Sequence, residues 1–219
     1  MNFYVLNSEG GRFGTKWAYG EVVEPIRYGA SCKCPVCGEA ISGKEYSPPH
    51  FIQVSSAKSE KWGDFLWGAG FQLMVSERFR QMYSQKNLRG IESFYPPAEI
   101  VRAGRKKRGD LPDSLPTYQL VQIIWNGANL DDAQSHVVRN SFDCAFCRGA
   151  VKSLQSIVIE QDSWSGADIF IARGLNGTIL VSERFKQGVE ADNLRNIWLI
   201  PAEKYVYDEQ QSGLWHVRK

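Results

Sequence analysis

The chain has 219 residues and a formal net charge of +2, with 43% hydrophobic and 23% charged residues. These values are those of a globular protein, so they exclude a disordered chain and leave room for one large domain or two small ones. No run approaches the roughly 18 apolar residues of a membrane span, and the first residues lack a secretory signal, so we expect no membrane and a cytoplasmic location.

The first half of the chain combines strand signals with one helix signal. Ser76 suits a helix N-cap, and Glu77 places negative charge at the positive end of that helix. Asn87 can adopt the left-handed conformation that ends a helix. Apolar runs bounded by turn residues predict strands at 3–6, 50–54 and 91–95.

A basic run, Arg102-Ala-Gly-Arg-Lys-Lys-Arg108, ends this half. It contributes to an uneven charge, because residues 1–109 carry 16 Lys and Arg against 10 Asp and Glu, and residues 110–219 carry 10 against 14. Such a run can bind nucleic acid. Glycine, proline and aspartate surround it, however, which favours a solvated linker between two parts of the chain.

The second half repeats the signals of the first. Ser182 and Glu183 open a second predicted helix, and Asn193 suits its end. Strands are predicted at 118–125, 154–159 and 204–207.

These signals belong to an internal duplication. Val75-Ser-Glu-Arg-Phe-Arg-Gln81 and Val181-Ser-Glu-Arg-Phe-Lys-Gln187 share six of seven residues, and their serines lie 106 positions apart. We therefore expect two sequence-related modules, 1–109 and 110–219. Each holds a cysteine turn, antiparallel strands and one capped helix, and the two pack with pseudo-twofold symmetry in an α+β fold. The repeated Arg78 and Arg184 are interpreted as structural.

Each module also carries a Cys-x-x-Cys pair, Cys34 with Cys37 and Cys144 with Cys147. In a reducing compartment such pairs are metal ligands or free thiols rather than disulfides. The leading arrangement is one zinc ion per chain, bound by all four thiolates across the two modules. Two alternatives remain at this point. Cys32 or His50 could join the first pair in a separate site, or the thiols could be buried without metal.

A zinc ion with four cysteine ligands would be structural, because a catalytic zinc keeps an open position. The three histidines, His50, His136 and His216, form no metalloprotease or nucleophile motif, and no phosphate-binding glycine loop is present. We therefore expect no catalytic residues, no organic cofactor and no enzymatic activity.

With these motifs the chain resembles the bacterial double-CxxCG motif proteins. The matching segments are Cys34-Pro-Val-Cys37-Gly38, Cys144-Ala-Phe-Cys147 and the Val-Ser-Glu-Arg-Phe helix; Arg148 stands where the motif has its second glycine. Members of that family are assigned as immunity proteins. The resemblance implies a non-catalytic inhibitor that binds one cognate toxin, with 1:1 stoichiometry. The alternative function is a zinc-ribbon protein that binds nucleic acid through residues 102–108, distinguished by strongly salt-dependent binding.

Overall fold

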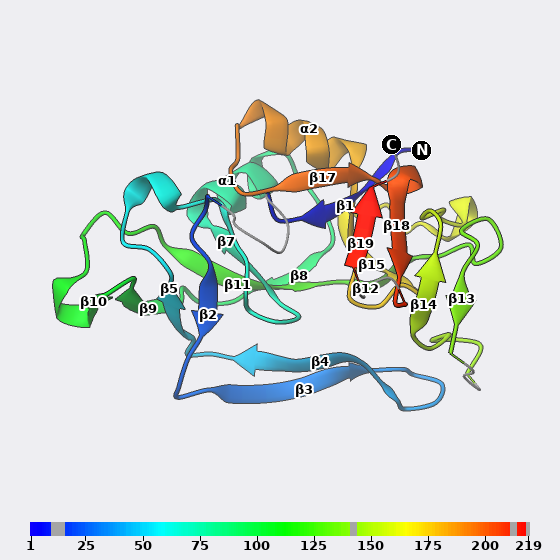
Figure 1. The fold of residues 1–219 in the computed structure, drawn as a ribbon, viewed down its shortest axis with the longest axis horizontal. Helices are drawn as coiled ribbons and strands as arrows, with labels where there is room; N and C mark the ends of the chain where they lie inside the picture. Colours follow the sequence, from blue (N-terminus) through cyan, green and yellow to red (C-terminus); the bar gives the residue numbers. More distant parts are fainter. Residues whose placement is uncertain (10–15, 141–143, 211–213, 218–219) are drawn as a thin grey trace.

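The computed structural model describes residues 1–9, 16–140, 144–210 and 214–217, which form a mixed α+β fold with two α-helices (Figure 1). The helices are α1, Glu77–Gln85, and α2, Glu183–Ala191. Ser76 Oγ accepts a hydrogen bond from the Phe79 backbone N–H, and Ser182 Oγ accepts one from Phe185. The predicted helices and their N-caps are therefore confirmed.

The two sheets that lie under the helices contain strands from both halves of the chain. The first sheet has the order β12-β15-β16-β1-β17, and the second has the order β6-β7-β11-β8. The strands of the first sheet are β1 (Phe3–Asn7), β12 (Trp125–Asn129), β15 (Ile169–Arg173), β16 (Ile179–Ser182) and β17 (Trp198–Pro201). Those of the second are β6 (Phe65–Leu66), β7 (Leu73–Ser76), β8 (Ile91–Phe94) and β11 (Tyr118–Ile123).

Two smaller sheets and one separate hairpin complete the described strands. The smaller sheets have the orders β10-β9-β5-β2 and β13-β14-β18-β19, and β3 pairs only with β4. Their strands are β2 (Gly20–Val22), β3 (Arg27–Lys33), β4 (Ala40–Ser47), β5 (Phe51–Val54), β9 (Glu99–Ala103), β10 (Lys106–Lys107), β13 (Val138–Arg139), β14 (Val151–Leu154), β18 (Tyr205–Asp208) and β19 (Leu214–Val217). In Figure 1 the β3–β4 hairpin lies along the lower edge of the molecule.

The first strand of each half pairs with the other half. β1 lies between β16 and β17, and β11 lies between β7 and β8, in all four cases antiparallel. The two halves of the chain are thus joined by hydrogen bonds between their strands as well as by side-chain packing.

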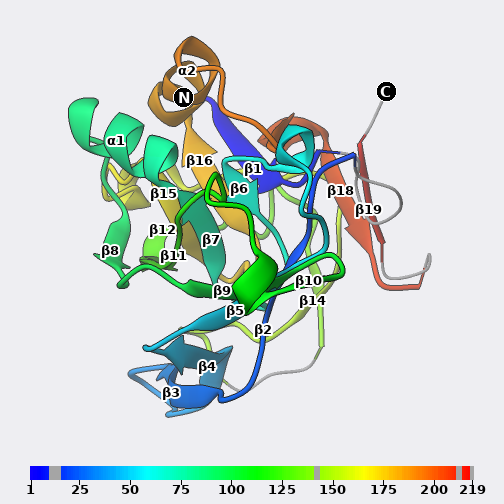
Figure 2. The same cartoon turned by 90° about the vertical axis from the view of Figure 1, so that its left-hand side faces the viewer.

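The helices lie side by side and share one hydrophobic core (Figure 2). The rings of Phe79 and Phe185 are 6.0 Å apart, and both side chains are fully buried. Gly188 allows the close approach of the helices, because a Cβ there would lie 2.8 Å from the Met82 sulfur. Burial of such large apolar side chains is the main stabilising contribution of this layer.

Three expectations about the strands and the basic run were wrong. Residues 155–159 lie outside the named strands, because their backbone hydrogen bonds go to separate loops, as from Ile157 N–H to Ala202 O. The sheets are also not purely antiparallel, since β5 pairs with β9 and β12 pairs with β15 in parallel. The basic run is not a linker: Lys106 and Lys107 pair with Ala103 and Arg102 in a β9–β10 hairpin.

None of the helices in the described part of the chain is both long enough and apolar enough to span a membrane.

Candidate metal centre

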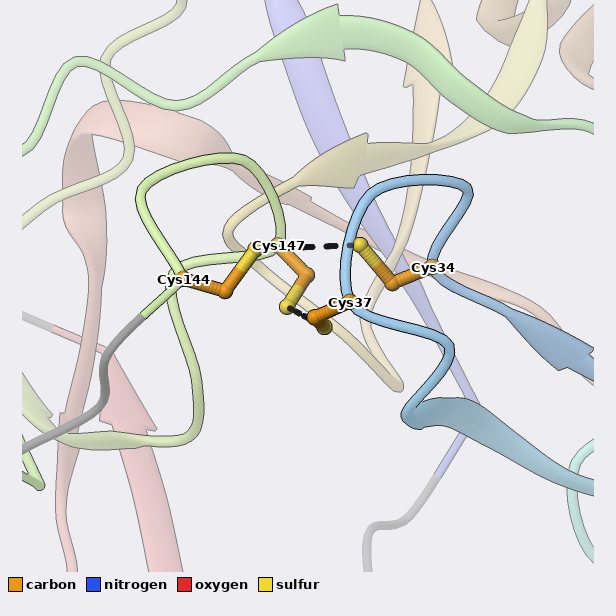
Figure 3. A group of neighbouring side chains, drawn as sticks. All are labelled: Cys34, Cys37, Cys144 and Cys147. Atoms are coloured by element: carbon orange, nitrogen blue, oxygen red, sulfur yellow. Dashed lines mark hydrogen bonds between the residues drawn. The ribbon is translucent and has the colours of Figure 1, made fainter.

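Two cysteine turns from opposite halves of the chain meet at one point (Figure 3). Residues 34–37 form the turn of the β3–β4 hairpin, and residues 144–147 lie between β13 and β14. The sulfur of Cys34 lies 3.9 Å from that of Cys144, and the sulfur of Cys37 lies 3.6 Å from that of Cys147. All four sulfurs lie within 4.8 Å of one another. The structure therefore brings together the four cysteines that the sequence assigned to one site.

The backbone of the first turn points its N–H groups at sulfur. The N–H groups of Val36 and Cys37 donate to the Cys34 thiol, and that of Glu39 donates to Cys37. Gly38 N–H closes the turn on the Cys34 carbonyl at 2.9 Å, with a φ of +77°. This left-handed conformation suits glycine, and N–H groups directed at sulfur stabilise thiolates.

The second turn has the same geometry although Arg148 replaces the glycine. Arg148 has a φ of +61°, and its N–H donates to the Cys144 carbonyl at 3.0 Å. The side chain is anchored, because its guanidinium donates to Leu130 O, Asp132 and Glu160. These contacts offset the strain of a non-glycine residue in the left-handed region. The departure from the double-CxxCG pattern at this position thus leaves the turn intact.

The sulfur spacing fits a tetrahedral ion. With zinc–sulfur bonds of about 2.3 Å, neighbouring sulfurs of a tetrahedron lie about 3.8 Å apart. The two measured contacts of 3.9 and 3.6 Å lie close to that value. Three of the cysteines are buried and Cys37 is exposed. The donor set is four soft sulfurs, which favours zinc over magnesium or calcium.

The thiols influence one another strongly. Burial raises the pKa of the Cys34 thiol, but hydrogen bonds from the N–H groups of Cys37 and Val36 and from the side chains of Cys37 and Cys147 together lower its pKa to about 6. Burial and the neighbouring Cys37 and Cys144 thiols raise the pKa of Cys147 to about 12. The first thiolate therefore forms easily, and the last forms only with difficulty beside the others. A bound cation would remove this repulsion.

Two apolar side chains pack against the sulfurs, and an arginine stacks on one of these side chains. Ile41 and Phe146 pack against the cysteine cluster. The Phe146 ring lies 6.0 Å from the Trp125 ring, and the Arg173 guanidinium lies 4.6 Å above the Phe146 centroid. The cluster is thus covered by apolar side chains, and a cation–π contact holds the Phe146 ring in place.

The structure does not bring Cys32 or His50 into this cluster. Within the described residues, the group of potential ligands around the two turns consists of Cys34, Cys37, Cys144 and Cys147. His50 is buried elsewhere, with its Nε2 2.9 Å from the Tyr46 carbonyl oxygen.

A pair of buried aspartates was not predicted to have a role. Asp64 accepts hydrogen bonds from Ser76 Oγ at 2.7 Å, from Arg78 at 3.0 Å and from the Arg195 backbone N–H at 2.9 Å. Asp168 accepts the matching set from Ser182 at 2.8 Å, Arg184 at 3.1 Å and the Arg89 N–H at 2.9 Å. The signal in the sequence was an aspartate shortly before each capping serine, 12 residues before Ser76 and 14 residues before Ser182. The structural interpretation of Arg78 and Arg184 agrees with these contacts.

Comparison with known proteins bears on the role of this fold. The immunity protein family (Imm11) matches residues 43–204, a range that begins after the first cysteine turn and includes the second. No curated protein matches the chain. The matched range covers most of the sequence and both helices, and it supports a role in toxin immunity. The chain therefore belongs to the Imm11 immunity protein family.

Proposed function

We propose that this protein binds one cognate bacterial toxin and neutralises it without catalysing a reaction. The observation that carries this proposal is the family match over residues 43–204. An inhibitor of this kind needs a stable scaffold and a complementary surface, and both can be provided without a catalytic constellation. We place its action in the cytoplasm, where the thiols that would bind metal stay reduced.

The proposed scaffold consists of two related modules, residues 1–109 and 110–219, packed about a pseudo-twofold axis. The matching strand orders β6-β7-β11-β8 and β15-β16-β1-β17 support this view. So do the equivalent hydrogen bonds of Asp64 and Asp168, each of which receives a backbone N–H from the opposite half. Duplication of an ancestral module explains why the same contacts occur twice.

The proposed metal is one structural zinc ion, held by Cys34, Cys37, Cys144 and Cys147. Four protein ligands leave no open position for a substrate, so the ion would supply cross-linking rather than chemistry. It would fix the tip of the β3–β4 hairpin to the segment between β13 and β14.

Co-expression with the toxin encoded beside this protein is the test of function. Cells that produce the active toxin should survive when this chain is present, and the purified pair should form a 1:1 complex by native mass spectrometry. Toxin-producing cells that die despite full expression of the chain, with no complex formed, would contradict the proposal.

The alternative, nucleic-acid binding, has one structural observation in its favour. The β9–β10 hairpin exposes Arg102, Arg105, Lys106, Lys107 and Arg108 on one short segment. Arg108 is already paired with Glu99 at 2.9 Å. Binding to a DNA or RNA duplex that weakens steeply between 50 and 200 mM salt, on the order of 10³-fold, would favour this alternative.

A further inference from the structure

A groove of about 490 Å³ lies between the β3–β4 hairpin and the body of the protein. Residues from both halves of the chain line it, among them residues of β1, β4, β8, β11, β12 and β16. We call it the hairpin groove. Its volume lies within the range of sites that accept a compact ligand or the side chains of a partner segment.

The walls of the hairpin groove are largely apolar and aromatic. Trp67, Phe71, Ile123 and Trp125 all contribute to it. Phe71 is 66% exposed, which is unusual for a phenylalanine. The indole N–H groups are already used, since Trp67 donates to Asn196 O and Trp125 donates to Asn176 Oδ1. The rings thus offer apolar surface to a partner without leaving their N–H groups unsatisfied.

The charged residues that line the hairpin groove are acidic. Glu45 and Glu92 are the charged residues of its lining. Neither forms an ion pair with any residue that the structure describes. Glu45 is half-buried and accepts a hydrogen bond from the Tyr95 hydroxyl at 3.1 Å. Burial and the two carboxylates raise the pKa of Tyr95 to about 12.

In this lack of a cation Glu45 differs from three other partly or fully buried acids. Asp64, Asp168 and Asp132 each contact an arginine. A half-buried carboxylate without a cation is costly, and a cation supplied by a partner would offset that cost. A further unused polar group lines the groove, because the buried Nε2 of Gln72 has no hydrogen-bond acceptor among the described residues.

From this charge and shape we infer that the hairpin groove is the docking surface for a protruding segment of the toxin that carries a lysine or arginine. The cationic head would meet Glu45 and Glu92, and its aliphatic stem would pack on Trp67, Phe71 and Trp125. This inference rests on the proposed function and adds to it the location of the contact and the chemistry of the partner.

The cysteine cluster has a direct role in this arrangement. One wall of the groove is β4, which includes Ser42, Gly43 and Glu45, and β4 begins shortly after the turn that holds Cys34 and Cys37. β3 and β4 pair with no other strand of the described sheets. The link between the two cysteine turns is therefore one of the contacts that hold the hairpin wall at its distance from the body, together with the hydrogen bonds of Tyr46 and Glu45.

The test measures binding of the purified protein to the toxin encoded beside it, in a catalytically inactive form. Glu92→Lys and Phe71→Ser both change exposed side chains, so the fold should tolerate them. Glu45→Gln removes charge at nearly constant shape. Glu60→Lys is the control, because Glu60 is exposed, lies outside the groove and gives the same change in net charge as Glu92→Lys.

We expect Glu92→Lys combined with Glu45→Gln to weaken binding at least about ten-fold, mainly by repelling the incoming cation. The Glu60→Lys control should bind like the wild type. The wild-type association rate should also fall as NaCl rises, and this dependence should flatten in the double variant.

Three outcomes would overturn the inference. If the wild type binds the toxin and the groove variants bind equally well, the groove is not the docking surface, although the proposed function stands. If these variants instead abolish a concentration-dependent dimer of the chain, the occupant is a second copy. If the wild type does not bind the toxin at all, the proposed function fails, and the inference fails with it.

Discussion

The sulfur atoms of Cys34 and Cys144 lie 3.9 Å apart, although the residues are separated by 110 positions in the chain. The contact joins the tip of the β3–β4 hairpin to the segment between β13 and β14. Because β3 and β4 pair only with each other, the hairpin is connected to the rest of the fold by side-chain contacts such as this one and the hydrogen bond from Tyr46 N–H to Gln72.

Removal of the proposed zinc ion should therefore loosen one region more than the others. After treatment with a strong chelator, we expect faster amide hydrogen exchange in residues 27–47 and 144–154 than before. The helices Glu77–Gln85 and Glu183–Ala191 should stay protected, because their packing is independent of the cysteines. Hydrogen exchange with mass spectrometry checks this. Unchanged exchange in the hairpin would show that the cysteine cluster does not restrain it.

Replacement of one thiol should act on stability first. Cys144→Ser should lower both the melting temperature and the zinc content, because serine is a poor ligand for zinc. Protection against the toxin should weaken only indirectly, through loss of folded protein and of the link that holds the hairpin in place. Cys32→Ser is the matched control, since Cys32 lies outside the four-sulfur group. Loss of protection with an unchanged melting temperature and zinc content would instead place Cys144 in the toxin contact.

The two buried aspartates should have similar energetic roles. Asp64→Ala and Asp168→Ala each leave a serine hydroxyl, an arginine and a backbone N–H without their acceptor. We expect each to lower the free energy of unfolding by about 1–3 kcal/mol, less than for a fully buried ion pair because both arginines are half-exposed. Denaturant unfolding measures this.

A nearby pair with two partly exposed members is the control for this comparison. Asp192 lies 3.8 Å from Lys86, and both side chains are 35% exposed. Asp192→Ala should cost below about 1 kcal/mol. A large loss for only one of the two buried aspartates would argue against equivalent roles in the two halves.

Gly90 should be intolerant of any side chain. Its φ is +114°, and an added Cβ would lie 1.8 Å from the Ile169 carbonyl oxygen. Gly90→Ala should therefore force a backbone shift at the point where residue 89 meets Asp168, and should destabilise the fold by more than about 1 kcal/mol. Gly109→Ala is the control, because nothing lies within 4 Å of its added Cβ. Equal melting temperatures for the two variants would contradict this account.

The sequence predicted those features that depend on residues close together in the chain, namely the helix caps and the cysteine turns. The cap residues Ser76 and Ser182 begin their helices as expected, and Asn87 and Asn193 both have a φ of +49° beyond the helix ends. The four metal-ligand candidates could also be grouped, because two-residue spacing restricts how the sulfurs of each turn can point.

Long-range pairing could not be predicted in the same way. The apolar runs of β1 and β11 indicate strands, but they do not identify the partner strands, which lie in the opposite halves. Trp67 and Trp125 are residues of a type that is usually buried in the core. Only the fold shows that they line a groove. The basic run forms a hairpin, in which Lys106 and Lys107 pair with Ala103 and Arg102. The amino-acid composition of the run did not indicate this pairing.

The metal content of the folded chain tests the central claim most directly. The account predicts close to one zinc ion per chain by elemental analysis of protein purified without added metal, and less than half of that for Cys34→Ser combined with Cys144→Ser. A folded, monodisperse wild-type chain that contains no metal would contradict it.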